Sequence, residues 1–379
     1  MGTSGHGGDG MAVMETSATV ADPRAAMSDP DPLRILLVAP PMLPVPPPTY
    51  AGTERVVAAI GDELHRRGHH VALVAAGDSD VAYELIPSVE RSLWSTGYAG
   101  DVASYMQHTI GIAWREAARF DIVHAHMENH SFPFANHCET PVITTMHGRL
   151  DAPGLPELLE SHRDVPMIAI SESQRRFFPD LRWVATIHHG LPLDGMPFSE
   201  TPGDYLAFVG RVTAEKGIRE AIDLSRASRV PLRAAAKVHS ASEWRHFEEV
   251  VQPAIDADEI EFLGEVGPLE RDPLYAGALA TVMLGGWPEP FGLVAIESMA
   301  TGTPVIARRA GALTETIEHG VTGFLVDDVG EAALAVEKVR ELDRRKIREL
   351  TLERFSPVRM VDEYLQAYRT VLAERSDAR

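Results

Sequence analysis

The sequence predicts an α/β fold with two doubly wound parallel-sheet domains, both Rossmann-like, that face each other across a cleft. First, short continuous apolar runs recur along the chain, as expected of buried parallel strands. Second, these runs alternate with segments whose apolar residues have helical spacing, the pattern of a doubly wound sheet. Third, the alternation stops in a Pro- and Gly-containing segment at 190–203 and then begins again. The length of 379 residues also suits two domains of about 100–200 residues each.

The first series of elements begins after residue 31. Its first helix has apolar residues at 56, 57, 60 and 64 and ends at Gly68, and a second helix is predicted over 99–118. Ligands of such sheets bind at the carboxyl ends of the strands. The predicted strands are 34–39, 71–76, 122–126, 142–148, 167–170 and 183–189. The residues at their carboxyl ends include His124, His126, His147, Gly148 and Ser171.

The second series begins at residue 206 and ends in an amphipathic helix. Its helices are predicted from Ile218 onward, over 244–255, from near Phe291 to Gly302, and over 355–372. Its predicted strands are 206–209, 232–238, 260–264, 280–284 and 303–307. The resulting division of the chain is a disordered tail at 1–31, a first domain at 32–190, a linker at 191–203, a second domain at 204–355 and a terminal helix at 356–379.

Composition excludes several classes of protein. A formal net charge of −20 argues against a nucleic-acid binder or a protein of anionic membranes, which need a basic face. The single cysteine, Cys138, rules out an internal disulfide and suits a reducing compartment. Because no apolar run is long enough to cross a membrane and the start lacks the pattern of a signal peptide, the sequence predicts a cytoplasmic protein without integral membrane association.

Two carboxylates mark the candidate site of the second domain. Pro290 keeps Glu289 extended on the loop before the helix that starts near Phe291. Glu297 is predicted about two turns into that helix. Between them lie the free N–H groups of a helix N-terminus, at Phe291, Gly292 and Leu293. This combination predicts a ligand that carries both hydroxyl groups and phosphates.

These residues resemble the retaining glycosyltransferases of family 4, which have the two-domain GT-B fold. The resemblance depends on Glu289 and Glu297, eight positions apart, within the sequences PEPFG, GTPVIA and GVTGFLV, and it extends over about residues 34–372. It implies that Glu297 binds the ribose hydroxyls of a nucleotide sugar and that Glu289 binds the hydroxyls of the donor sugar. It also implies that the segment after 356 crosses back to the first domain.

Three further segments match the family. Arg211 and Lys216, in FVGR and EKG, are predicted to meet at a turn before a helix and to bind a diphosphate. His147, followed by Gly148, matches the histidine that faces the transferred sugar. The turn before the first helix, where the family has two glycines, reads Ala51-Gly52, and Gly52 is the predicted contact to the donor phosphates.

The sequence favours chemistry without a metal. His124, His126 and His130 have no standard zinc-ligand spacing. The three D-x-D triplets do not complete the predicted site and arise easily by chance among 55 acidic residues. We therefore expect no metal and no cofactor, with a UDP- or GDP-linked sugar as co-substrate.

The predicted function is a retaining hexosyltransferase that moves a sugar from an α-linked nucleotide sugar to an unidentified small-molecule, sugar or lipid acceptor. The predicted catalytic residues are Arg211, Lys216, Glu289 and His147, and the predicted donor-binding residues are Gly52, Glu297, Phe291, Gly292 and Leu293. Whether Glu289 is a covalent nucleophile or assists front-face attack stays open. The alternatives are an epimerase or phosphorylase on the same scaffold, or a nucleotide-sugar binding protein without turnover.

Overall fold

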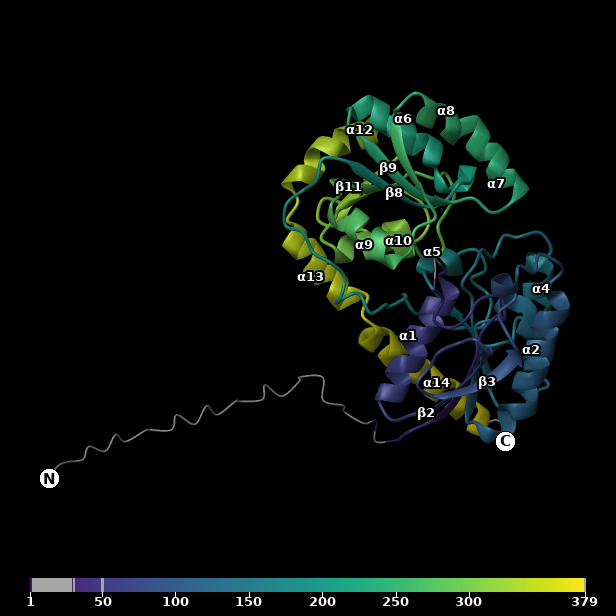
Figure 1. Ribbon diagram of the computed structural model, residues 1–379. Coiled ribbons are helices and arrows are strands. Elements are labelled where there is room, and N and C mark those ends of the chain that lie inside the picture. The colour runs from purple at the N-terminus through teal and green to yellow at the C-terminus, as the bar shows by residue number, and fades with distance from the viewer. Residues whose placement is uncertain (2–28, 30, 49–50, 378–379) are drawn as a thin grey trace.

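The computed structural model describes residues 1, 29, 31–48 and 51–377. The predicted disordered tail at 1–31 therefore lies almost wholly outside the described residues, as do Thr49 and Tyr50 in the loop before the first helix. Figure 1 shows two lobes, each built on its own sheet, with the chain passing from one to the other near residue 190 and returning before its last helix.

The first lobe contains a seven-stranded sheet in which every pair of neighbouring strands is parallel. The strand order is β3-β2-β1-β4-β5-β6-β7. The strands are β1 (Arg34–Val38), β2 (His70–Ala76), β3 (Glu84–Val89), β4 (Ile122–Ala125), β5 (Val142–Thr145), β6 (Met167–Ala169) and β7 (Trp183–Thr186).

Helices cover both faces of this sheet. Along β1, Ile35 and Leu37 point to the side of α1 (Thr53–Arg66), whereas Leu36 and Val38 point to the side of α2 (Ala103–Glu116). The alternation follows from the period of two in a strand, and because both faces are covered the strand is apolar throughout. The shorter helices α3 (Phe132–Ala135), α4 (Leu155–Ser161) and α5 (Glu172–Arg175) follow β4, β5 and β6.

The sequence analysis missed β3. This strand lies at the edge of the sheet, contains Pro87 and begins with the partly exposed Glu84. Proline has no N–H to donate to a neighbouring strand, so within sheets it is found mainly on edge strands. An edge strand is also less buried, and the segment 84–89 therefore lacks the apolar run by which the other strands were predicted.

The second lobe contains a six-stranded parallel sheet of order β10-β9-β8-β11-β12-β13. Its strands are β8 (Leu206–Arg211), β9 (Leu232–Lys237), β10 (Ile260–Gly264), β11 (Ala280–Met283), β12 (Val305–Arg308) and β13 (Gly323–Val326). Its helices are α6 (Ile218–Ser228), α7 (Ala241–His246), α8 (Gln252–Asp256), α9 (Pro268–Ala276), α10 (Leu293–Ala300), α11 (Leu313–Thr316), α12 (Val329–Lys338) and α13 (Arg344–Arg354). The two sheets give the α/β class predicted from the sequence.

The helix predicted over 244–255 is three segments. A π-helical turn, Phe247–Val251, separates α7 from α8, and Pro253 lies in the first turn of α8. A proline is accommodated there because the N–H groups of a first turn have no partner within their own α-helix.

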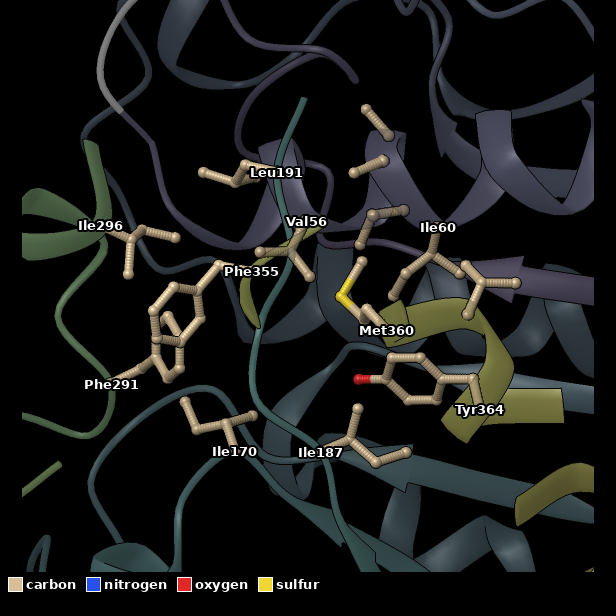
Figure 2. Packing of buried hydrophobic residues seen from close by; sticks show 14 of the residues in the cluster. Val56, Ile60, Ile170, Ile187, Leu191, Phe291, Ile296, Phe355, Met360 and Tyr364 are labelled. Carbon is tan, nitrogen blue, oxygen red and sulfur yellow. The ribbon is translucent and has the colours of Figure 1, made fainter. Parts of the chain in front are cut away.

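The two crossings between the lobes lie side by side. The N–H of Leu191 donates to the carbonyl of Phe355 at 3.0 Å. The chain then enters α14 (Pro357–Asp377), which packs on α1 of the first lobe. Figure 2 shows the resulting core, in which Ile296 and Phe291 of the second lobe and Val56 of the first belong to one apolar cluster with Phe355. No helix in the described part of the chain is both long enough and apolar enough to span a membrane.

Candidate active site

The helix that carries Glu297 begins two residues later than predicted. Its N-cap is Gly292, with φ +92°, and a Cβ at this position would lie 2.8 Å from a methyl carbon of Leu313. Because only glycine adopts this conformation without strain, the extended loop ends here and α10 starts at Leu293. Glu297 is therefore about one turn into the helix rather than the predicted two.

Lys216 and Glu289 form an ion pair at the carboxyl edge of the second sheet. Their loops approach closely at two glycines: a Cβ on Gly217, whose φ is +78°, would lie 2.3 Å from the backbone nitrogen of Gly285. The two side chains are 21% and 11% exposed, and the ammonium lies 5.5 Å from the centre of the Trp287 ring. The structure thus brings together two of the predicted catalytic residues, and it does so where a parallel sheet binds its ligands.

A pocket opens at this ion pair. Its floor comes from the ends of β8 and β11 and its wall from α10. The residues that line it are Phe208, Val209, Gly210, Glu215, Lys216, Val282, Met283, Gly285, Trp287, Glu289, Val294 and Leu313. We call it the Lys216 pocket.

Arg211 is not among the residues that line the Lys216 pocket. It is the last residue of β8, its side chain is about half exposed, and it donates to Glu243 at 3.1 Å. Lys237, at the end of the neighbouring β9, pairs with Glu265 at 2.8 Å. Of the two predicted phosphate-binding cations, the structure therefore places Lys216 in the pocket and pairs Arg211 with another carboxylate.

Glu297 is fully buried and its carboxylate has three partners. Arg271 and Tyr275, both from α9, approach it at 3.3 Å and 3.1 Å. The third partner is Arg55, which comes from α1 of the first lobe and forms an ion pair with the same oxygen as Arg271. A ligand hydroxyl that binds Glu297 from the cleft must therefore take the place of Arg55.

The N-termini of α1 and α10 lie against each other. Gly52 is the N-cap of α1, and a Cβ there would be 3.4 Å from a methyl carbon of Leu293, the first residue of α10. Phe291 is buried and contacts the rings of His189 and Phe355. Because each helix presents the positive end of its dipole, the junction between Gly52 and Leu293 is an environment that favours an anion.

His147 is partly buried and lies in a row with the buried His124, His126 and His189 at the carboxyl edge of the first sheet. Its Nε2 lies 2.9 Å from Nδ1 of His126, and its ring stacks on His189 at 5.2 Å. Burial lowers the pKa of His147 to about 3, and burial with the neighbouring rings holds the pKa values of His126 and His189 well below the usual range. At neutral pH His147 is thus uncharged, so it can hydrogen-bond a sugar hydroxyl but is not a proton donor of imidazolium type.

The sequence analysis missed Glu128, which holds the loop of His147. Its φ is +48°, and its Oε1 accepts from the N–H of His147 at 3.0 Å. Burial raises the pKa of Glu128 to about 7, although the backbone N–H groups of Gly148 and His147 act in the opposite direction. Its position directly after the strand of 122–126 was the available signal, since loop residues at the carboxyl end of a parallel strand line the ligand site.

Glu128 gives the site a predicted pH dependence. The carboxylate is a stronger acceptor than the neutral acid for the two N–H groups that fix His147, so the loop is held best above pH 7. We expect kcat/KM to fall as the pH drops through about 7. Glu128→Gln should abolish this fall of kcat/KM with decreasing pH, and it should lower kcat/KM at pH 8 by about tenfold. Glu157→Gln, an exposed glutamate of α4, is the control. An unchanged pH profile in Glu128→Gln would rule out this role.

Metal ligands are not grouped in the described residues: no three His, Cys, Asp or Glu side chains there lie as a metal site requires. That the reaction needs no metal stays a prediction.

Comparison with known families covers most of the chain. Residues 198–357 match the family described as Glycosyl transferases group 1, and residues 50–191 match Glycosyltransferase Family 4. A D-inositol 3-phosphate glycosyltransferase of Corynebacterium kroppenstedtii is 33% identical over 174 residues. That match covers 40% of this chain and 36% of the relative, so it spans about a third of the relative's length.

Solved structures share the whole architecture. AviGT4, a glycosyltransferase of avilamycin A biosynthesis, superposes with a TM-score of 0.68 at 23% identity, over 90% of this chain and 98% of that one. An Anabaena protein, HepE, in complex with UDP and glucose superposes with a TM-score of 0.67 at 17% identity, over 88% and 98%. At these identities the likeness shows the fold. Two facing parallel sheets, both family matches and the paired glutamates on and before α10 lead to one conclusion: the chain belongs to glycosyltransferase family 4 and has the GT-B fold.

Proposed function

We propose that this protein is a retaining hexosyltransferase that uses a UDP- or GDP-linked α-sugar, transfers the sugar to an acceptor hydroxyl and needs no metal ion. The observation that carries the proposal is the Lys216 pocket, in which a cation is paired with Glu289 beside the first turn of α10. The site thus offers a positive charge for a phosphate and a carboxylate for a sugar within one hydrogen-bonding distance of each other.

Breaking the bond between an anomeric carbon and a diphosphate builds negative charge on the leaving group and positive charge on the sugar. Lys216 and the N-terminus of α10 can stabilise the first, and Glu289 the second. His147, uncharged at neutral pH, can bind a sugar hydroxyl from the other lobe. We favour front-face attack, in which the leaving phosphate takes the proton of the acceptor hydroxyl, because this needs no protein base.

The relatives support a nucleotide-sugar donor. The complex of HepE with UDP and glucose has the same fold, and family membership implies a glycosyl donor. In this chain the carboxylate suited to ribose hydroxyls is that of Glu297, which Arg271 and Tyr275 of α9 contact.

The test is incubation with a panel of UDP-, GDP- and ADP-sugars, with release of nucleoside diphosphate measured with and without acceptors. A transferase releases diphosphate faster when an acceptor is present, and the anomeric configuration of the product, read by NMR, shows retention or inversion. An epimerase would change the sugar without releasing diphosphate, a phosphorylase would require phosphate, and a binding protein would bind the donor without turnover.

Activity is expected to survive chelation. Lys216 and the N-terminus of α10 supply the positive charge that a divalent ion supplies in metal-dependent transferases. Turnover should therefore be the same in EDTA as in Mg²⁺ or Mn²⁺. A loss of turnover in EDTA that either ion restores would contradict this part of the proposal.

Glu297→Gln is expected to weaken binding of the nucleoside diphosphate by about 10- to 100-fold, because hydrogen bonds between ribose hydroxyls and a carboxylate are charge-assisted. Isothermal titration calorimetry with UDP and GDP measures the effect. Arg55→Met is the control, since it also breaks the Arg55–Glu297 contact between the lobes but leaves the carboxylate in place. Equal losses in both variants would assign the effect to the lost contact between the lobes and not to ribose.

A further inference from the structure

A second pocket meets the Lys216 pocket at Glu289. Among the described residues that line the two pockets, Glu289 is the one that they share. The second pocket lies between the lobes. Its other walls are the loop after β5, helix α5 with the residues that follow it, and Pro288 and Pro290. Its lining residues are Gly148, Arg149, Leu150, Asp151, Ser173, Gln174, Phe177, Pro288, Glu289 and Pro290. We call it the Phe177 pocket.

Because Glu289 lines both pockets, a donor sugar in one pocket would lie next to a ligand in the other. In a transferase the acceptor hydroxyl must reach the carbon that leaves the donor, so the acceptor site has to adjoin the donor-sugar site. If Glu289 binds the donor sugar, as proposed above, the Phe177 pocket lies on its other side and next to Gly148, which follows His147.

Apolar groups form part of the wall of the Phe177 pocket. Phe177 is 46% exposed, a large fraction for a phenylalanine, and Pro288 and Pro290 line the same pocket. An exposed aromatic ring in a concave site offers its electron-rich face to the C–H groups of a ligand, and the C–H face of a sugar or polyol ring is of this kind.

The polar part of the wall is a guanidinium fixed by carboxylates. Arg149 forms two bonds of 2.7 Å to Asp151 and one of 3.1 Å to Glu215, and it lies 4.5 Å from the centre of the Trp287 ring. Gln174 is unavailable to a ligand, because its amide nitrogen donates to the carbonyls of Met146 and Gly148 and its oxygen accepts from Ile170.

The charge of the pocket disfavours an anion. Arg149 is the one cation among the described residues that line it, whereas Asp151 and Glu289 also line it and Glu215 lies against Arg149. Glu289 is itself paired with Lys216 of the other pocket. When the two cations Arg149 and Lys216 are counted with the three carboxylates of Asp151, Glu215 and Glu289, the formal charge around the pocket is −1. A phosphate or carboxylate placed here would meet three carboxylates and two cations that are already paired with them.

We propose that the Phe177 pocket is the acceptor site and that the acceptor is an uncharged polyhydroxylated ring, a sugar or cyclic polyol, rather than a phosphorylated or carboxylated compound. Asp151 accepts hydrogen bonds from ring hydroxyls, Arg149 donates to them, and the ring's C–H face packs on Phe177. The transferred glycosyl group leaves the diphosphate, bonds to one acceptor oxygen, and that oxygen's proton passes to the leaving phosphate. This inference rests on the proposed transferase function.

The experiment compares acceptors that differ only in charge. The pairs are glucose with glucose 6-phosphate, myo-inositol with inositol 3-phosphate, and glycerol with glycerol 3-phosphate, each tested with the donor that the enzyme hydrolyses. We expect the neutral ring compounds to accelerate diphosphate release at least tenfold more than their phosphorylated partners. Asp151→Asn, which lowers the negative charge, should narrow that difference.

Phe177→Ala should raise the acceptor KM about tenfold, because the acceptor ring loses the aromatic face on which it packs. Phe134→Ala is the matched control, since Phe134 is 40% exposed but lies on α3 outside both pockets. Saturation-transfer NMR of the neutral acceptor, with nucleoside diphosphate bound, gives a second readout that does not depend on turnover.

Either of two results would overturn the inference: a preference for the phosphorylated members, or a Phe177→Ala variant that behaves as Phe134→Ala does. Donor hydrolysis distinguishes this failure from that of the proposed function. A protein that hydrolyses a nucleotide sugar but prefers anionic acceptors is still a transferase with another acceptor class, whereas a protein that neither hydrolyses nor transfers any donor fails both proposals.

Discussion

Lys216→Ala is expected to lower kcat by about 10²–10³-fold, the loss that follows removal of one preorganised group from the charge developing in a transition state. Lys216 is held in place before any substrate binds: Glu289 pairs with its ammonium, the Trp287 ring lies 5.5 Å away, and the turn after it closes against Gly285. Since the side chain needs little reorganisation to meet a phosphate, most of its electrostatic interaction is available to the transition state.

Lys237→Ala is the matched control for this variant. Lys237 ends the neighbouring strand β9 at the same sheet edge and is also paired with a carboxylate, Glu265, but it does not line the Lys216 pocket. Both variants should be compared in steady-state kinetics and in thermal unfolding, because Lys216→Ala removes the ion pair of Glu289. Equal kcat values for the two variants would remove Lys216 from the mechanism.

The sequence predicted the parts of the fold that have a local signature. Buried parallel strands such as β1 and β8 are apolar runs, and both sheets and the family membership follow from these runs and from the segment of Glu289 and Glu297. Strand β3 has no such run because it lies at an edge and contains Pro87. The start of α10 was placed too early because its N-cap is fixed by a positive φ at Gly292, which apolar periodicity does not report.

The candidate site was harder to predict because its contacts join distant residues. Arg55 and Glu297 are 242 positions apart, and Arg149 meets Glu215 across 66. Nothing in the spacing around Arg211 indicates that Glu243 would pair with it, since that contact depends on where α7 packs. The roles assigned to Arg211, Gly52 and His147 stay predictions, which substitutions at these three positions can test.

The buried histidines predict a steep loss of stability in acid. His124 is fully buried between Tyr368 and Thr145, each at 2.7 Å, and burial with the nearby His147 lowers its pKa to about 3. His126 contacts His124, His147 contacts His126, and His189 stacks on His147. All three also have lowered pKa values, caused first by burial. In an unfolded chain each of these histidines has a pKa of about 6.5. Below that pH the unfolded state therefore binds protons that the folded state does not.

The sign follows from proton linkage. Below pH 6.5 each of the four histidines lowers the free energy of unfolding by about 1.4 kcal/mol for every further pH unit, because the unfolded state binds a proton that the folded state does not. Glu54 and Glu128 act in the opposite direction: burial raises both pKa values to about 7, so between pH 7 and about 4.5 the folded state takes up their protons first. Among these six groups, four protons against two leave a loss of about 3 kcal/mol per pH unit near pH 5.5, and below 4.5, where the carboxyl offset ends, about 5 kcal/mol. Burial also lowers the pKa values of His69 and His130, which add to the loss, and raises that of Asp62, which opposes it.

Such a slope would exhaust the stability of an ordinary domain, about 5–15 kcal/mol, within a few pH units. We expect the free energy of unfolding, measured with urea at pH 7.0, 6.0, 5.5 and 5.0, to change little between pH 7.0 and 6.0, where proton uptake by Glu54 and Glu128 offsets the histidines, and to fall steeply between pH 6.0 and 5.0. His126→Gln should reduce the slope by about 1.4 kcal/mol per pH unit, because one neutral buried imidazole is removed. This change in slope is expected even if the substitution lowers the stability at pH 7. His108→Gln, at an exposed position of α2, should leave the slope unchanged. A flat profile between pH 6 and 5, or equal slopes in the two variants, would show that the cluster takes up protons while folded, and His147 would then be available as an acid in the reaction.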